Sequence, residues 1–200
     1  MTGFISKRNK VYLKDGIVVK ECTSQKAALF EKNRLLFLKE NGVAVPDVIG
    51  LDGSSLFLEY IEGITLPDLL EDGSFCGKSG FIAECIIAWF QSFYNAVQHS
   101  STKEIRGDIN GRNFIFTGTA VYGIDFEEIV FGEIAVDLGR FLAYLSTYAL
   151  KDGSSRDEIS RLLLDLFVPA FGISASTILA EKDRELAAIK LRRHKAASTG

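Results

Sequence analysis

Cysteine, proline and histidine are scarce in this chain of 200 residues, which contains three, three and two of them. Cys22, Cys76 and Cys85 are scattered and form no Cys-x-x-Cys pair, so neither a disulfide framework nor a zinc site is expected. A reducing cytoplasm fits this use of cysteine. The few prolines exclude collagen-like and proline-rich low-complexity chains. His99 and His194 leave few candidates for a histidine general base.

Long apolar runs are also missing. The longest apolar stretch, residues 81–90, is interrupted by Glu84 and falls short of the roughly 18 residues that a membrane-spanning helix needs. The first residues lead directly into Lys7-Arg8 and lack the apolar core of a signal peptide. We therefore expect no membrane partner and a cytoplasmic location.

The charge balance excludes some classes of protein and is uneven along the chain. A net charge of −3, with 47% hydrophobic and 11% aromatic residues, excludes a disordered chain and makes a nucleic-acid partner unlikely on composition. Residues 1–40 hold nine basic and four acidic side chains, whereas residues 41–150 hold five and fifteen. A site that takes a cation from the first part and carboxylates from the second would produce this pattern, and so would a solvated surface.

Turn and periodicity patterns predict a strand-rich beginning followed by helices. Strand-like residues 11–13 and 17–20 flank the hairpin turn Asp15-Gly16, and a helix over 25–40 ends at Asn41-Gly42. An extended run covers residues 55–61. Further helices are expected over 80–98, 134–149, 155–167 and 177–195, with a short helix starting at Thr65 and strands at 113–116 and 121–124. The fold class is therefore α+β, with two lobes over residues 1–62 and 63–200.

The helix over 25–40 carries a charged residue on its apolar face. Ala28, Glu31, Leu35 and Leu38 share one face by their spacing, so Glu31 needs a partner if that face is buried. Lys20 ends the apolar strand 17–19 and has the same need. A Lys20–Glu31 pair would satisfy both side chains. Taken alone, the two residues are equally well explained without a pair: Lys20 as a solvated strand end and Glu31 as a residue at the edge of the helix face.

A second group of polar residues surrounds the two short strands. Asp108 and Asn113 form Asp-x-x-x-x-Asn in a loop before the first strand, and Asp125 ends the returning strand. A hairpin would bring Asn113 and Asp125 together, and an amide oxygen beside a carboxylate suits Mg²⁺. Asp108 would then lie close by, placed to accept a proton.

In this order, Lys20, Glu31, Asp108 with Asn113, and Asp125-Phe126 resemble the motifs of protein-kinase-like phosphotransferases. More narrowly, the sequence resembles aminoglycoside phosphotransferase-like kinases. Features of that group are matched by the hinge-like segment 56–66, the expected Gly-Val-x-Val-Pro strand at 42–46, Gly107-Asp108 and Asp137-Leu138. The resemblance covers roughly residues 10–150. It implies a bilobal kinase-like fold with a small antiparallel-sheet N-lobe, one helix in that lobe and a mostly helical C-lobe.

The resemblance also implies an enzyme that uses ATP and Mg²⁺ to phosphorylate a hydroxyl group. Lys20 would hold the α- and β-phosphates and Glu31 would orient it, while Asn113 and Asp125 would hold the metal. The backbone carbonyl of Glu59 and the backbone N–H of Ile61 would bind the adenine edge. Asp108 would be the general base, with Arg112 beside it in the same loop. Asp137 would brace this loop, or would only be a charge at a helix N-terminus.

Several departures from the pattern bear on the function. Arg106 stands where the related enzymes usually have histidine, and Glu127 stands where protein kinases have glycine, which favours small-molecule kinases. There is no Gly-x-Gly-x-x-Gly loop, and Lys7 and Arg8 occupy the turn that would cover the phosphates. About fifty residues, 151–200, remain for acceptor binding, and this small number argues against a bulky aminoglycoside as the phosphate acceptor.

These features favour a small-molecule acceptor. One alternative is a small atypical protein kinase or ATPase similar to the KEOPS-complex or RIO kinases, which would have a protein partner. The other is a pseudokinase scaffold, suggested by Arg106 and the missing glycine-rich loop.

Overall fold

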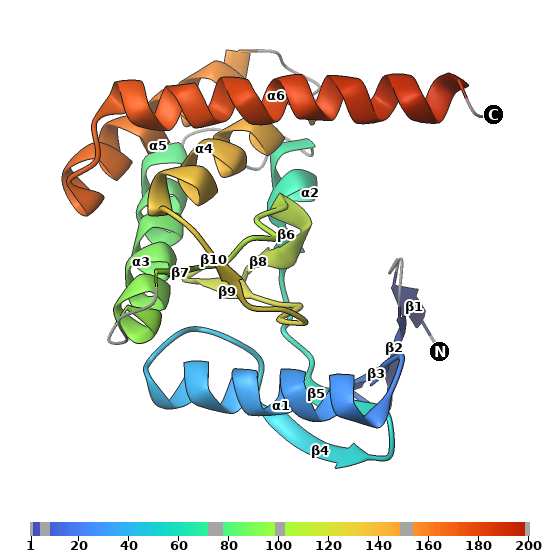
Figure 1. The fold of residues 1–200 in the computed structure, drawn as a ribbon. Helices are drawn as coiled ribbons and strands as arrows, with labels where there is room; N and C mark the ends of the chain where they lie inside the picture. Colours follow the sequence, from blue (N-terminus) through green and yellow to red (C-terminus); the bar gives the residue numbers. More distant parts are fainter. Residues whose placement is uncertain (1, 5–8, 72–77, 99–102, 149–153, 199–200) are drawn as a thin grey trace.

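The N-terminal part of the chain forms a five-stranded antiparallel sheet with one helix. The computed structural model describes residues 2–4, 9–71, 78–98, 103–148 and 154–198. Helix α1 (Gln25–Glu40) packs against β4 and β5 (Figure 1). The strands, in their order across the sheet, are β1 (Thr2–Phe4), β2 (Lys10–Lys14), β3 (Ile17–Glu21), β5 (Ser55–Glu59) and β4 (Val48–Asp52).

Local signals define the first hairpin and α1 as the sequence predicts. Asp15 and Gly16 have φ angles of 51° and 79°, and a two-residue turn with positive φ at both positions matches the twist of the flanking strands. Ser24 caps α1 by accepting a hydrogen bond from the Ala27 N–H at 3.1 Å. Gly42 follows the helix with φ 79°. This turn and these caps depend on residues that are adjacent in sequence, so periodicity and turn chemistry suffice to predict them.

The strand expected at 42–46 is wrong. Val43 and Val45 are buried, but this segment forms no strand, and β4 begins only at Val48. The carbonyl of Ala44 accepts one hydrogen bond from Trp89 Nε1 at 2.9 Å and another from the Gly123 N–H at 3.0 Å. The segment therefore joins α1 to the C-terminal part of the molecule instead of extending the sheet.

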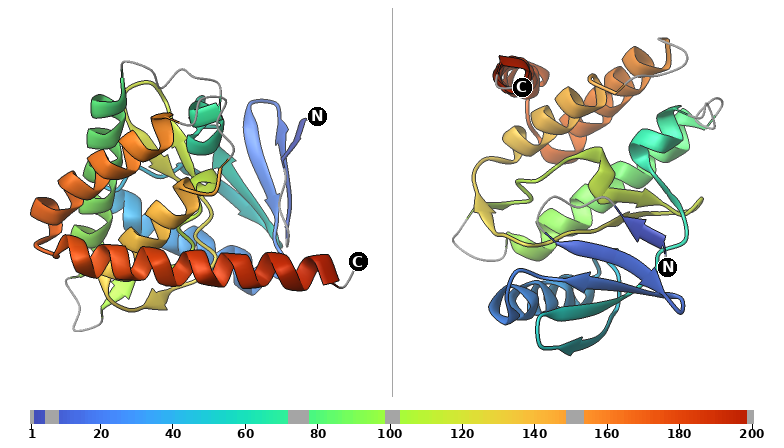
Figure 2. Two further views of the ribbon diagram at one scale, coloured as in Figure 1. Left: turned by 90° about the horizontal axis from the view of Figure 1, so that it is seen from above. Right: turned by 90° about the vertical axis from the view of Figure 1, so that its right-hand side faces the viewer.

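The C-terminal part is mainly helical. Its helices are α2 (Leu66–Glu71), α3 (Ser79–Val97), α4 (Ile134–Leu145), α5 (Ser154–Phe171) and α6 (Ala175–Ser198). Its short strands are β6 (Ile64–Thr65), β8 (Phe114–Phe116) and β9 (Val121–Gly123) in one sheet, and β7 (Glu104–Ile105) and β10 (Val130–Phe131) in another, with the 3-10 turn η1 at Gly111–Asn113. Figure 2 shows α4, α5 and α6 at the end of the molecule opposite α1. Among the described residues, no helix is long and apolar enough to cross a membrane.

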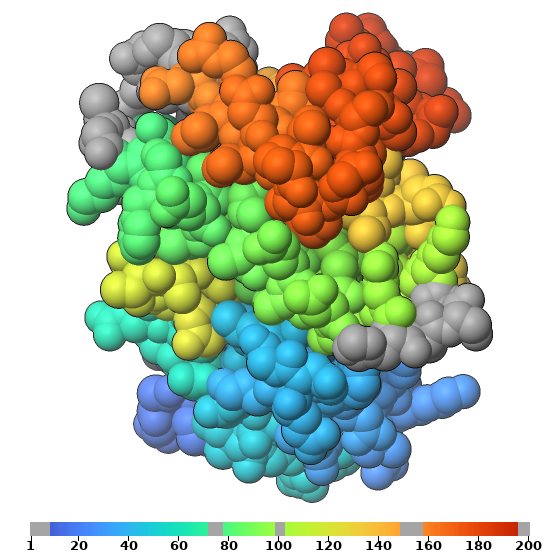
Figure 3. All heavy atoms as spheres, turned by 90° about the vertical axis from the view of Figure 1, so that its left-hand side faces the viewer, coloured from blue at the N-terminus to red at the C-terminus, as the bar shows by residue number. Residues whose placement is uncertain are grey.

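Aromatic side chains fill the core of the helical part. Trp89 of α3 contacts Phe114 of β8 edge to face, with ring centroids 4.8 Å apart, and Phe90 contacts Phe141 in the same way at 5.3 Å. In the space-filling view, the green and yellow segments of this part lie between the blue N-terminal segments and the red C-terminal helix (Figure 3). The core thus joins α3, the β8–β9 hairpin and α4 into the support of the loops described below.

Two helix ends differ from the sequence expectations. α4 ends at Leu145, four residues before the expected end at 149. α5 continues through Pro169 to Phe171, because Phe167 packs on Phe90 and Phe171 packs on Tyr94. Tertiary packing here outweighs the local cost of a proline inside a helix. Lys7, Arg8, Cys76 and His99 lie outside the described residues.

Candidate active site

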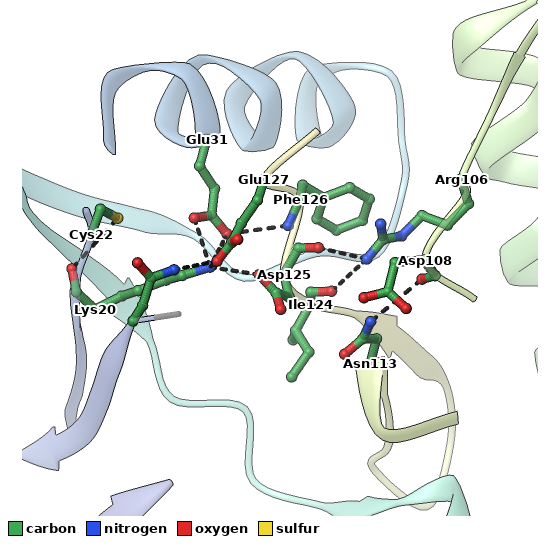
Figure 4. A network of polar contacts seen from close by, with 11 residues as sticks. Lys20, Cys22, Glu31, Arg106, Asp108, Asn113, Ile124, Asp125, Phe126 and Glu127 are labelled. Carbon is green, nitrogen blue, oxygen red and sulfur yellow. Dashed lines mark hydrogen bonds and ion pairs between the residues drawn. The ribbon is translucent and has the colours of Figure 1, made fainter. Parts of the chain in front are cut away.

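Lys20 of β3 lies at the centre of a cluster of three carboxylates. Its ammonium nitrogen is 2.8 Å from the Glu31 carboxylate, 2.6 Å from Asp125 Oδ1 and 2.8 Å from Glu127 Oε1 (Figure 4). Lys20 and Glu31 are 4% and 1% exposed, and Glu31 also accepts a hydrogen bond from the Phe126 N–H at 3.1 Å. The Lys20–Glu31 contact is the one that the apolar face of α1 predicts.

The electrostatics of this cluster favour a charged lysine. Burial by itself would lower the pKa of Lys20, but the carboxylates of Glu31 and Asp125 outweigh it and hold the pKa above its ordinary value. Burial raises the pKa of Glu31, and the negative charges of Asp125 and Glu127 add to this effect, whereas Lys20 opposes it. Three carboxylates share one ammonium group. The cluster therefore carries excess negative charge and can accept a further cation.

The β8–β9 hairpin brings Asn113 and Asp125 together. The Ile124 N–H donates to the carbonyl of Asn113 at 2.9 Å, which sets Asp125 just beyond the paired strands. Asp125 has φ 67°, a left-handed conformation that a residue other than glycine rarely adopts. Burial opposes ionisation of Asp125, but the positive charge of Lys20 outweighs this effect and lowers its pKa. Asp125 is therefore a fixed carboxylate that stays ionised at neutral pH.

Arg106 supports the backbone on which Asp125 stands. Its guanidinium group donates to the carbonyls of Ile124 at 2.8 Å and Asp125 at 2.6 Å, and lies 4.2 Å from the ring centre of Phe126 (Figure 4). Arg106 is 2% exposed. The buried guanidinium group of Arg106 therefore holds the unusual backbone conformation of Asp125.

Asp137 ties the start of the Asp108 loop to the helical core. The carboxylate of Asp137 accepts hydrogen bonds from the N–H groups of Arg106 at 2.6 Å and Gly107 at 3.0 Å, and from the Tyr94 hydroxyl at 2.7 Å. Asp137 is fully buried, and burial raises its pKa despite these donors. The expected bracing contact is present, so this side chain is more than a charge at the start of α4.

The loop from Asp108 to Asn113 presents its polar groups to solvent and to the site. Asp108 is exposed, and the amide nitrogen of Asn113 lies 3.4 Å from the Asp108 carbonyl. Asn110 caps η1 through the Arg112 N–H at 3.0 Å and also accepts from the Tyr148 hydroxyl at 2.7 Å. Tyr148 therefore helps to fix the loop that carries Asp108 and Arg112.

A cavity of about 460 Å³ opens beside the cluster and reaches the end of β5. Glu59 and Ile61, the residues expected at the adenine edge, line this cavity together with Asn113 and Arg112. The other lining residues are Val11, Val18, Lys20, Glu31, Leu35, Pro46, Leu58, Tyr60, Gly63, Thr65, Ile115, Ile124 and Asp125. The cavity is apolar near the sheet, which suits a flat base, and net negative at the cluster, so an anionic tail there would need the further cation that the carboxylates can accept.

Nearly all the site residues expected from the sequence meet at this place. Lys20, Glu31, Glu59, Ile61, Arg112, Asn113 and Asp125 line one cavity. Asp108 lies on the same loop as Arg112 and Asn113 and outside the set of lining residues. The sequence interpretation missed Glu127, which contacts Lys20 and the side-chain amide of Asn9. The acidic pair Glu127-Glu128 directly after Asp125-Phe126 was the available sign.

The side chains also fit a divalent cation. Glu31, Asp125 and Glu127 each offer a carboxylate oxygen, and these oxygens all lie within 4.8 Å of one another. Hard oxygen ligands of this kind suit Mg²⁺ or Ca²⁺. Cys22 lies beside the cluster, but burial raises the pKa of its thiol to about 11, so it is protonated at neutral pH and is a poor metal ligand or nucleophile.

Solved structures with a similar fold exist. No family model and no curated protein matches the sequence. The structure of the aminoglycoside phosphotransferase APH(2'')-IIa in complex with gentamicin is 12% identical, with a TM-score of 0.63 over 92% of this chain and 79% of its own. The ternary complex of APH(2'')-IIa with streptomycin and ATP is also 12% identical, with a TM-score of 0.60 over 92% and 81%.

Amicoumacin kinase hAmiN in complex with AMP-PNP, Ca²⁺ and Ami is 11% identical, with a TM-score of 0.58 over 90% of this chain and 77% of its own. At these identities the similarity concerns the fold. The chain shares the α+β fold of these solved structures, with the small antiparallel sheet and the helical part that the sequence resemblance implies.

Proposed function

We propose that this protein transfers the γ-phosphoryl group of ATP to a hydroxyl group of a small molecule. One observation carries the proposal: Lys20, Glu31 and Asp125 are in contact at the polar end of the cavity that Asn113 also lines. Phosphoryl transfer depends mostly on positioning and on neutralising charge, and this arrangement offers a fixed cation beside fixed carboxylates. The similarity of the fold to APH(2'')-IIa and amicoumacin kinase supports the same reaction type.

We expect ATP to enter the cavity in one orientation. Val18, Leu58 and Ile61 offer apolar surface for the adenine ring, and the backbone at Glu59 and Ile61 offers the hydrogen-bonding groups of an extended segment. The phosphates then point towards Lys20. Because Lys20 is shared among three carboxylates, a phosphate group replaces one of these contacts when ATP binds.

The metal expected in this reaction fits the same place. Asp125, Glu127 and the amide oxygen of Asn113 would hold Mg²⁺, since the Asn113 amide nitrogen is used in the contact with Asp108. When bound, the metal offsets negative charge on the β- and γ-phosphate oxygens. Arg106 and Asp137 contribute by fixing the two backbone segments that present these ligands.

The chemical step uses Asp108 as the base. The acceptor oxygen forms a bond to the γ-phosphorus, the bond between that phosphorus and the bridging oxygen of the β-phosphate breaks, and ADP leaves. The proton of the acceptor hydroxyl moves to the carboxylate of Asp108, which is exposed and therefore accessible to an acceptor.

Thermal shift and ADP release test the proposal. We expect ATP with Mg²⁺ to raise the melting temperature, Asp125→Asn to abolish the shift, and Asp108→Asn to keep it while lowering acceptor-dependent ADP release about 10²–10⁴-fold. Asp52→Asn makes the same charge change at an exposed position of β4 and serves as the control. Full ADP release by Asp108→Asn would overturn the assigned base.

A pseudokinase scaffold without phosphoryl transfer is the second candidate. The observation that favours it is the occupation of Lys20 by three carboxylates, which compete with phosphate groups. A scaffold would show no ADP release with any acceptor. A protein kinase or ATPase would instead phosphorylate protein or require a protein partner for ADP release.

A further inference from the structure

A row of side chains leads away from Asp108 along α4. Arg140 and Tyr144 are four residues apart and share one face of α4, and Tyr148 follows three residues after this helix ends at Leu145. At the near end, the Tyr148 hydroxyl donates to Asn110 Oδ1 at 2.7 Å and accepts from the Gly111 N–H at 3.2 Å. The row therefore begins at the loop that carries the proposed base.

The far end of the row is an arginine pair on one buried carboxylate. Glu185 of α6 is 8% exposed and contacts Arg140 Nε at 3.3 Å and Arg192 Nη2 at 2.5 Å. Figure 1 shows α6 lying along α4. Gly139 permits the close approach, because a Cβ atom there would lie 2.7 Å from the Ile178 carbonyl oxygen. Two guanidinium groups share one carboxylate, so this end carries excess positive charge.

Tyr144 joins the two ends. Burial raises the pKa of Tyr144, and the charges that act on it next are those of Glu185, Arg192, Asp108 and Arg140. Tyr144 lies one helical turn after Arg140, and α4 also contacts η1, the turn within the loop that carries Asp108. The side chains of Arg140 and Arg192 are 38% and 58% exposed, so both remain accessible to a ligand.

We propose that Asp108, Tyr148, Tyr144, Arg140, Glu185 and Arg192, called here the acceptor row, bind the acceptor, and that this acceptor carries a carboxylate or phosphate group as well as its hydroxyl. This inference rests on the proposed phosphotransferase function. Arginine binds such groups through two parallel N–H donors, and Arg192 has donors left after its contact with Glu185. The tyrosine rings offer apolar surface to the carbon skeleton between the two polar groups.

The charges of the acceptor row disfavour a polycationic acceptor. Within the row, Asp108 is the one carboxylate that has no arginine contact among the described residues, and it is needed as the base. An aminoglycoside carries several ammonium groups, which would face Arg140, Arg192 and the nearby Arg112. The acceptor class therefore comprises hydroxy acids and phosphorylated sugars or polyols.

The test measures ADP release with four acceptor groups: hydroxy acids such as D-glycerate, sugar phosphates such as D-glucose 6-phosphate, neutral sugars, and gentamicin. We expect release with an anionic group, and the two anionic arms distinguish carboxylate from phosphate recognition. Arg192→Met should raise the acceptor KM at least about tenfold and leave the KM of ATP unchanged. Arg184→Met is the matched control, because Arg184 is exposed on the same helix and pairs with Glu181 at 2.5 Å.

The outcomes separate this inference from the proposed function. Release only with neutral sugars or gentamicin, or equal acceptor KM values for Arg192→Met and Arg184→Met, overturns the acceptor row while leaving the phosphotransferase intact. If ATP neither binds nor turns over, the proposed function fails. Calorimetric binding of D-glycerate or D-glucose 6-phosphate that Arg192→Met removes would still support the acceptor row, and no binding of either compound overturns it.

Discussion

The ammonium group of Lys20 and the carboxylate of Glu31 lie 2.8 Å apart, and both side chains are buried. This contact joins β3 to α1 and also sets the position of the carboxylates at Asp125 and Glu127, which contact the same nitrogen. Removal of the lysine would leave Glu31 as an uncompensated charge in the protein interior. The pair is therefore both a structural element and part of the proposed phosphate site.

Replacing Lys20 should destabilise the fold as well as impair ATP binding. We expect Lys20→Met to lower the free energy of unfolding by about 3–5 kcal/mol, because breaking one side of a buried ion pair strands the other charge. Urea unfolding measures this loss. The ATP-dependent thermal shift should disappear in the same variant.

The double variant Lys20→Met/Glu31→Gln separates these two effects. It should be more stable than Lys20→Met alone, because the stranded charge is gone, while ATP binding stays lost. Additive losses of stability in the two single variants would contradict a direct Lys20–Glu31 interaction.

Arg106 should matter for stability although it lies outside the cavity lining. Arg106→Met removes two charge-assisted hydrogen bonds to the carbonyls of Ile124 and Asp125 and the contact with the Phe126 ring. We expect a loss of about 2–4 kcal/mol in the free energy of unfolding, together with slower phosphoryl transfer. Arg112→Met, at an exposed position nearby, should change stability by less than about 0.5 kcal/mol. Equal effects of the two variants would argue against the supporting role of Arg106.

A second buried ion pair links α1 to the helical part. Arg34 and Glu104 contact each other with side chains only 9% and 11% exposed, and Arg34 lies three residues after Glu31 on α1. Burial and the charge of Arg106 lower the pKa of Arg34. Glu104→Gln should therefore cost about 3–5 kcal/mol of unfolding free energy and raise the KM of ATP, because α1 carries Glu31.

The neighbouring pair Lys103–Glu133 provides the control for Glu104→Gln. Its side chains are 69% and 68% exposed, so Lys103→Met should change stability by at most about 1 kcal/mol. A cycle with Arg34→Met and Glu104→Gln measures the coupling between the buried partners. Coupling near zero would show that the contact contributes nothing to stability.

Tyr148 should make the fold sensitive to alkaline pH. Burial raises the pKa of Tyr148 to about 12, so the unfolded chain loses this proton at a lower pH than the folded protein. The stabilisation that protonated Tyr148 contributes to the folded state is fully present below about pH 10 and is lost as the pH rises towards 12. We expect Tyr148→Phe to reduce the fall in unfolding free energy between these pH values by about 1–2 kcal/mol. The measurement is urea unfolding of both proteins at pH 9, 10 and 11. If the unfolding free energy of Tyr148→Phe falls with pH as steeply as that of the parent protein, the pKa of Tyr148 is not raised.

Much of the fold follows from residues that are close in sequence. The Asp15-Gly16 turn and the caps of α1 each depend on a few neighbouring residues, and their positions match the predictions. The periodicity of α1 identifies Glu31 as a charged residue on an apolar face before any partner is known. The ends of α4 and α5 differ from the predictions. In α5, Pro169 is helical because Phe167 and Phe171 pack on the core.

The sequence by itself therefore determined which parts of the chain are strands and helices and which polar residues need partners, because turns, caps and periodicity act over a few residues. Apart from the Lys20–Glu31 pair, only the tertiary structure decided which residues are those partners. Glu127 contacts a lysine more than a hundred positions earlier, and Arg106 reaches the carbonyls beyond β9. The proposed acceptor row depends on the return of α6 along α4, which places Arg140 and Arg192 on the same carboxylate of Glu185. Contacts of this kind arise from the packing of whole elements, which no local pattern encodes.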